Sequence, residues 1–128
     1  MLTLRIDGRR VHDIPSFYDE INRVFMTGVD WQLGPSLDAL DDMLRGGYGA
    51  LHGVDGARVL WEEHALAAEA LGVGTTREQL LAKLEDPRFD TAAARRKLAR
   101  LEADGGPTYF ETVLEVFADH PAIDLVLA

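Results

Sequence analysis

The chain has no cysteine and only two serines among its 128 residues. The absence of thiols excludes disulfide bonds, thiol catalysis and thiolate metal ligands, and it suits a reducing cytoplasm. Both serines, Ser16 and Ser36, stand at expected helix caps and outside any nucleophile elbow, which argues against serine catalysis. The four histidines show no i, i+4 pair of the metalloprotease kind, so we expect no enzyme, no metal and no cofactor.

Long apolar runs and a surplus of basic residues are also absent. A membrane-spanning helix needs about 18 apolar residues, and no segment approaches this length. Because the first ten residues also lack the apolar core of a signal peptide, we expect a cytoplasmic protein that does not bind membranes. The formal net charge of −9 argues against nucleic acid as a ligand and favours a basic protein partner.

The distribution of apolar residues predicts an α/β fold. With 47% hydrophobic residues, a chain of this length can bury one core without disulfides, which indicates a single domain. Strands are expected over residues 2–7 and 57–61. A last strand over residues 122–128 follows a helix that starts near Thr108, which is consistent with a parallel sheet.

Residues 73–107 predict an α-helical insertion within this domain. Thr75 and Glu78 have the spacing of a capping box at the start of one helix, which Pro87 then ends. A second helix is expected over residues 91–103. The two helices form either a core of their own or an apolar stripe that packs on the rest of the domain.

The most informative stretch is residues 33–45, in which a loop with glycine and proline leads into a short acidic helix. Ser36 is expected to cap its first turn. Helical spacing places three leucines on one buried stripe, Leu37, Leu40 and Leu44. The same spacing turns three aspartates toward solvent, Asp38, Asp41 and Asp42.

Two of these aspartates repel each other, which slightly destabilises the helix. Asp38 and Asp42 are four residues apart and repel each other by about 0.2–0.5 kcal/mol when exposed. Asp38 gains from the positive start of the helix, and Asp41 has Arg45 at i+4. Nothing local in the sequence compensates Asp42. The stretch is therefore either a solvated helix face or a surface that binds a cationic partner.

Residues 33–44 resemble the core motif of the barstar family, bacterial inhibitors that plug the active site of a secreted ribonuclease. The family has aromatic residues, a glycine and then a run of the Asn-Leu-Asp-Ala-Leu-Trp-Asp type. This chain has Trp31, Gly34 and then Ser-Leu-Asp-Ala-Leu-Asp-Asp. The resemblance implies a small three-stranded parallel sheet packed against helices. It also implies that Asp38 and Asp42 match the two helix aspartates that the family presents to its ribonuclease.

Further contacts follow from the same resemblance. Ser36 and Asp41 depart from the family, which often has Asn and Trp at these positions. Tyr48 corresponds to a loop aromatic that often contacts the partner, and Trp31 is either a packing residue or an aromatic at the rim. The implied partner-binding residues are Asp38, Asp42, Asp41, Trp31, Ser36, Tyr48, Asp119 and Glu115, the last two from an acidic stripe near the end of the chain. Residues 73–107 lie outside the motifs.

We therefore interpret residues 1–128 as one barstar-like domain without enzymatic activity. The expected function is that of a monomeric, intracellular antitoxin that blocks the basic active site of a ribonuclease or related nuclease toxin. One alternative is a metal-assisted phosphate hydrolase that uses Asp38, Asp41 and Asp42, with further ligands from Glu115 or Asp119. Another is a protein-interaction adaptor that binds through the helical insertion.

Overall fold

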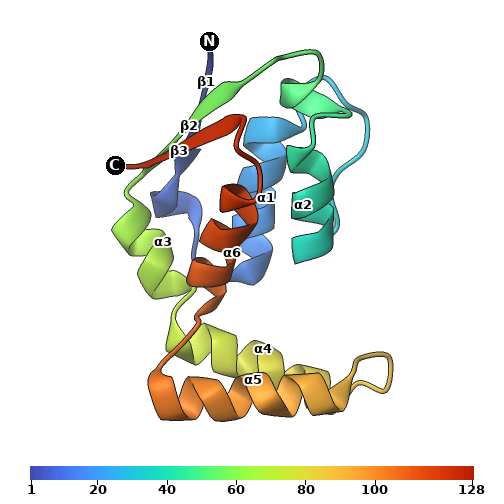
Figure 1. Ribbon diagram of the computed structural model, residues 1–128, viewed down its shortest axis with the longest axis vertical. Coiled ribbons are helices and arrows are strands. Elements are labelled where there is room, and N and C mark those ends of the chain that lie inside the picture. The colour runs from blue at the N-terminus through green and yellow to red at the C-terminus, as the bar shows by residue number, and fades with distance from the viewer.

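The computed structural model describes residues 1–128 and contains a three-stranded parallel sheet with six α-helices (Figure 1). The strands are β1 (Leu2–Asp7), β2 (Ala57–Glu62) and β3 (Ile123–Leu127), and they lie side by side in the order β1-β2-β3. Val59 at the centre of β2 pairs with Leu4 of β1 and Leu125 of β3. The predicted α/β class with a small parallel sheet is confirmed.

The sheet buries one of its faces. Alternate side chains of β2 are buried, and the indole of Trp61 lies among the rings of Phe17, Phe110 and Phe117. The opposite face carries cross-strand ion pairs such as Arg58 with Asp124, 3.1 Å apart. The predicted second strand is therefore present, with one face buried and with Arg58 and Glu62 exposed on the other.

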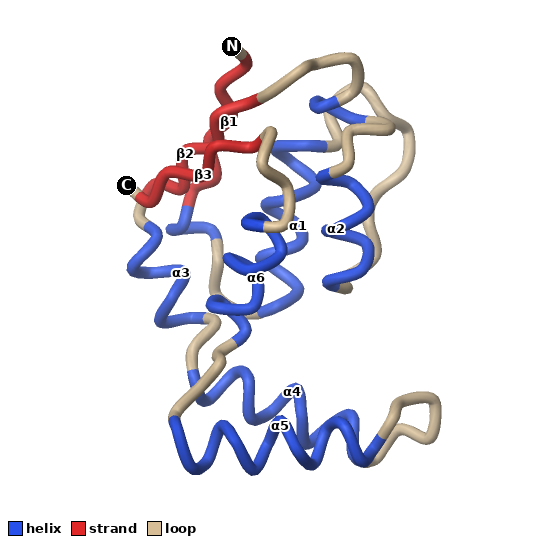
Figure 2. The backbone as a smooth tube through the Cα atoms, in the orientation of Figure 1, coloured by secondary structure: helices blue, strands red, loops and turns tan.

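The helices connect the strands and form the core against the sheet (Figure 2). Their bounds are α1 (Ile14–Phe25), α2 (Leu37–Leu44), α3 (His64–Ala70), α4 (Val73–Leu84), α5 (Thr91–Asp104) and α6 (Tyr109–Ala118). Short 3-10 helices cover Gly8–Arg10 and Gly49–Leu51. The core is one cluster of 22 buried residues that includes side chains of α1, α2, β2 and α6. None of the helices has both the length and the apolar composition needed to cross a bilayer.

Most helix starts follow the local chemistry of the sequence. Asp13 and Ser16 form a capping box at α1, and Thr108 and Glu111 form another at α6, the helix predicted to start near Thr108. The capping box predicted at Thr75 is wrong, because α4 already begins at Val73. The Thr75 hydroxyl instead donates to the carbonyl oxygen of Ala70 at 2.6 Å, which fixes the turn between α3 and α4.

Helices α4 and α5 form an antiparallel hairpin at one end of the molecule, and we call residues 73–107 the inserted hairpin (Figure 1). Its two helices pack on each other through buried side chains that do not belong to the 22-residue cluster, namely Leu80, Ala94 and Leu101. Thr76 ties the hairpin to the body, because its Oγ1 accepts the backbone N–H of Tyr109 at 2.8 Å.

Candidate partner-binding site

The candidate surface is the outer face of α2, whose inner face is fixed in the core. Ser36 Oγ accepts the backbone N–H of Ala39 at 3.1 Å, so Ser36 caps the helix as predicted. The inner face is made of Leu37, which is half-buried, and of Leu40, Met43 and Leu44, which are buried. These contacts leave α2 little freedom to rotate, so its outer face keeps a fixed orientation.

Asp38 and Asp42 lie on this outer face, and both are exposed. Neither carboxylate takes part in an ion pair within the chain. Asp38 stands in the first turn of α2, where the free backbone N–H groups favour negative charge. Both carboxylates therefore remain available to a cationic group from outside the molecule.

Asp42 does have a local partner that the sequence does not reveal. The Tyr48 hydroxyl donates to Asp42 Oδ2 at 2.8 Å, and the Tyr48 ring lies 4.7 Å from the Trp31 ring between centroids. Burial and this hydrogen bond raise the pKa of Tyr48 to about 12. The Trp31 residue is 47% exposed. The exposed Trp31 thus packs on the half-buried Tyr48 beside the Asp42 carboxylate, at the rim of the surface.

Glycines give the loop after α2 the shape that brings Tyr48 back to the helix. Gly46 and Gly49 both have positive φ, at +85° and +74°. A Cβ at Gly49 would collide with the carbonyl oxygen of Phe25 in α1. The loop therefore packs tightly against α1 at Gly49. This contact fixes the position of Tyr48, the residue before Gly49.

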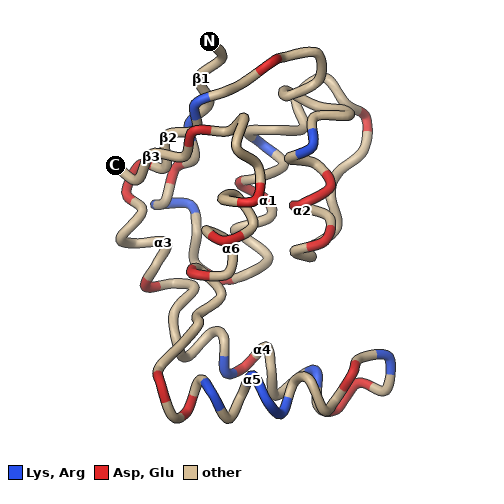
Figure 3. The backbone as a smooth tube through the Cα atoms, viewed as in Figure 1, with Lys and Arg blue, Asp and Glu red and all other residues tan.

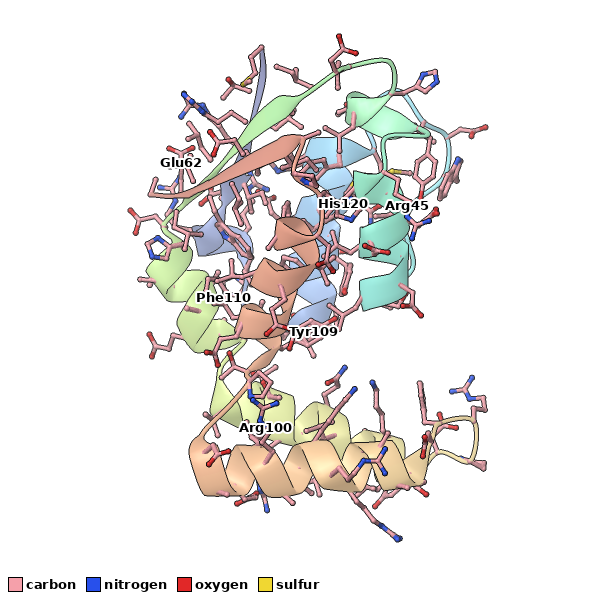
Figure 4. The ribbon with its side chains drawn as sticks, viewed as in Figure 1. Arg45, Glu62, Arg100, Tyr109, Phe110 and His120 are labelled. Atoms are coloured by element: carbon pink, nitrogen blue, oxygen red, sulfur yellow. The ribbon has the colours of Figure 1, made fainter.

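Asp41 is engaged inside the molecule. Its Oδ1 lies 2.7 Å from His120 Nε2, and its Oδ2 lies 3.2 Å from an Arg45 nitrogen. The hydrogen bond from His120, followed by that from Arg45, lowers the pKa of the Asp41 carboxyl. Figure 4 shows His120 and Arg45 at the boundary between α2 and α6. Asp41 therefore holds α2 in place, whereas Asp38 and Asp42 form no ion pair with another element.

The expected acidic residues of the last helix are exposed on an element that packs against α2. Asp119 is the C-terminal cap of α6 and immediately precedes His120, and both Asp119 and Glu115 are exposed without an ion pair. Because α2 packs beside α6, acidic positions of the two helices occur on neighbouring elements (Figure 3). Glu111, on the same stripe, is used in the capping box.

The three aspartates of α2 do not form a cation site. Asp41 is bound to His120 and Asp42 to Tyr48, while Asp38 stands alone in the first turn. No group of three His, Asp or Glu side chains converges on a common point anywhere in residues 1–128. The geometry gives the metal-assisted hydrolase no support.

Sequence reasoning missed two contacts of this surface. The Tyr48 hydroxyl reaches Asp42 over a separation of six residues, and the glycine pair after Arg45 is a signal that could have indicated such a sharp return. His120 is 79 residues from Asp41, and nothing in either local sequence indicates that the two side chains meet.

The comparison with protein families now bears on this geometry. A family model described as Barstar (barnase inhibitor) matches residues 1–102. The chain belongs to the barstar family. The matched span contains α1, α2 and the inserted hairpin as far as residue 102, and it ends before α6. A search among curated proteins found no match.

Membership in the barstar family indicates a general function for the chain. The family description is that of an inhibitor of barnase-type ribonucleases, a protein that acts by binding another protein and not by catalysis. Residues 36–42, whose sequence resembles the family motif, form the capped start of α2 in this barstar-family chain, with the exposed carboxylates of Asp38 and Asp42.

Proposed function

We propose that the chain is an intracellular antitoxin that inhibits a barnase-type ribonuclease with the acidic outer face of α2. The observation that carries this proposal is the pair of exposed carboxylates, Asp38 and Asp42, on a helix whose other face is buried. Trp31 and Tyr48 extend the surface on one side, and Asp119 and Glu115 extend it on the side of α6.

The inhibitory mechanism is occupation of the phosphate-binding positions of the enzyme. A ribonuclease holds RNA phosphates with Arg, Lys or His side chains, and carboxylates form strong charge-assisted hydrogen bonds with the same groups. Carboxylates on a fixed helix fill these positions without the entropy loss of ordering a flexible segment. RNA is then excluded because its binding groups are already paired.

The charge of the whole chain supports rapid encounter with such an enzyme. A net charge of −9 attracts a basic protein over a distance of about one Debye length, which is about 8 Å at physiological ionic strength. The association rate constant should therefore fall as salt rises. The dissociation rate constant should depend mainly on the close contacts of Asp38 and Asp42.

Inhibition titrations against purified barnase-type ribonucleases, barnase among them, test this proposal. We expect complete inhibition of at least one enzyme at a one-to-one ratio. The substitution Asp42→Asn removes the charge but keeps an oxygen that accepts the Tyr48 hydroxyl. It should weaken binding at least about tenfold, a scale set by charge pairs between barnase and its own inhibitor.

Glu69→Gln is the matched control, because it removes an equal charge from an exposed carboxylate of α3, away from α2 (Figure 1). This variant should retain the wild-type dissociation constant within about twofold. Failure to inhibit every enzyme of the panel would overturn the proposal. If Asp42→Asn and Glu69→Gln weaken ribonuclease binding equally, the affinity depends on net charge and not on the α2 face.

A further inference from the structure

The inserted hairpin and the body enclose a groove of about 790 Å³ that begins at the first turn of α2. One wall is formed by the start of α1 and by residues 35–38, and the other by α4, α5 and the turn between them. Tyr109, at the start of α6, lies between the two walls (Figure 4). Residues 36–38 therefore belong both to the groove and to the acidic face of α2.

The hairpin wall presents two lysines without ion-pair partners. Lys83 and Lys97 both line the groove, and neither forms a salt bridge in the chain. Burial lowers the pKa of Lys83, Lys97 lowers it further, and Asp38 across the groove acts in the opposite direction. The lysine pair is thus a place where an anionic group from outside would relieve an existing repulsion.

An exposed aromatic residue stands beside this pair. Phe89, in the turn between α4 and α5, is 45% exposed, and Lys83 Nζ lies 5.3 Å from the centre of its ring. Pro35 and Leu37 add apolar surface to the opposite wall. The groove therefore fits a chain segment that has an apolar side chain next to an acidic one.

The carboxylates of the groove are less available than its lysines. Asp13 accepts the backbone N–H of Ser16 at 2.8 Å, and Asp86 lies 2.7 Å from an Arg88 nitrogen. Only Asp38 and Glu78 remain without a bonded partner among the carboxylates that line it. Asp13 keeps its negative charge, since its bond partner is a neutral N–H, so the groove favours a carboxylate only where it lies directly at Lys83 and Lys97.

Charge is distributed unevenly between the hairpin and the rest of the chain. Residues 73–107 contain seven Lys and Arg against six Asp and Glu, whereas the remaining residues contain six against 16. The body therefore repels any acidic part of a partner, and the hairpin does not. A second copy of the chain is a poor occupant, since two molecules of charge −9 repel each other.

We infer that the groove receives an acidic and apolar segment of the same ribonuclease that α2 engages, with its carboxylate at Lys83 and Lys97. The inference rests on the proposed function, because a protein seated on α2 must border the groove at residues 36–38. The hairpin then acts as a second arm of the inhibitor. It binds a part of the ribonuclease outside the active site, and this contact contributes to which ribonuclease the inhibitor binds.

Charge reversal at the two lysines tests the inference. The variant Lys83→Glu with Lys97→Glu is compared with Arg95→Glu with Arg96→Glu, which makes the same change of charge on α5 but outside the groove. The probe is the tightest-binding ribonuclease of the panel, made inactive and measured by calorimetry. We expect the groove variant to weaken binding at least tenfold and the control variant less than threefold.

The outcomes separate this inference from the proposed function. If the groove and control variants bind alike while Asp42→Asn binds at least tenfold more weakly, the groove inference fails and the inhibitor function stands. If no ribonuclease is bound, both fail. Phe89→Ala, at an exposed position, should also weaken binding without lowering the melting temperature. If a labelled RNA oligonucleotide binds the wild-type chain and not the groove variant, the occupant is nucleic acid and the inference is overturned.

Discussion

His120 Nε2 lies 2.7 Å from Asp41 Oδ1 and joins two elements that are 79 residues apart in the chain. Because a carboxylate only accepts hydrogen bonds, the imidazole N–H donates. Arg45 binds the other oxygen of Asp41 at 3.2 Å, so the carboxylate is held from both sides. The pair fixes the rotation of α2 beside α6, and this rotation aims Asp38 and Asp42 toward solvent.

We predict that Asp41→Asn lowers thermal stability in a pH-dependent manner. The folded chain lowers the pKa of Asp41, so this carboxylate contributes stability that is fully present above 3.8, its ordinary pKa. The contribution is lost as the pH falls through the lowered pKa. At pH 7 the melting temperature of wild type should exceed that of Asp41→Asn by a few degrees. The two melting temperatures should converge as the pH falls below 3.8.

Asp55→Asn is a suitable control for this series, because Asp55 is exposed in a loop and forms no ion pair. Its melting temperature should follow that of wild type at every pH. A difference between wild type and Asp41→Asn that stays constant down to the acid limit would contradict the ion-pair role.

We predict that Tyr48→Phe weakens ribonuclease binding by about two- to tenfold, less than Asp42→Asn does. The substitution removes the hydroxyl that donates to Asp42 and leaves the ring beside Trp31. The Asp42 carboxylate keeps its charge but loses its fixed orientation. Calorimetry on both variants and on their combination measures the coupling between the two side chains.

An alkaline titration gives an independent check of the same contact. The pKa of Tyr48 is raised to about 12, so its contribution to stability is fully present below the ordinary value of 10.0 and is lost as the pH rises through about 12. The difference in tyrosinate absorbance between wild type and Tyr48→Phe reports this titration. Asp42→Ala removes both the acceptor and its charge and should lower the midpoint, and an unchanged midpoint would mean that the hydrogen bond does not form.

The features predictable from the sequence are those that depend on nearby residues. Helix α2 begins where Ser36 caps it, and α6 begins at the capping box of Thr108 and Glu111. The alternating pattern of residues 2–7 predicts β1, and the mostly apolar run of residues 57–61 predicts β2. The same kind of local pattern gave a wrong prediction at Thr75. Its spacing to Glu78 fits a capping box, but the chain leaves α3 in a tight turn, and the N-cap residue of α4 is Gly72, three positions before Thr75.

The features that could not be predicted depend on contacts between distant segments. Asp41 and Asp42 are consecutive aspartates of one helix, yet only Asp41 meets His120. The groove depends on the direction in which the hairpin leaves the body, and periodicity within α4 and α5 carries no information about that direction. Partner-binding roles for Asp38, Asp42 and Asp119 remain predictions, because exposure on neighbouring helices makes them available without demonstrating a contact.

The last prediction concerns the joint that sets the direction of the inserted hairpin. Thr76 is 5% exposed, and its hydroxyl donates to the Gly72 carbonyl oxygen at 2.7 Å while accepting the Tyr109 N–H at 2.8 Å. Thr76→Val has nearly the same volume and leaves the buried Tyr109 N–H without an acceptor. We expect urea denaturation to show a loss of about 1–3 kcal/mol in the free energy of unfolding.

Thr76→Ser separates this hydrogen bond from packing, because serine keeps the hydroxyl and loses one methyl group. It should recover most of the stability that valine loses. If the hairpin contributes to ribonuclease binding, Thr76→Val should also weaken that binding by releasing one wall of the groove, whereas Thr76→Ser should bind almost as wild type does. Equal stabilities of the two variants would show that Tyr109 N–H finds another acceptor and that Thr76 does not set the hairpin's direction.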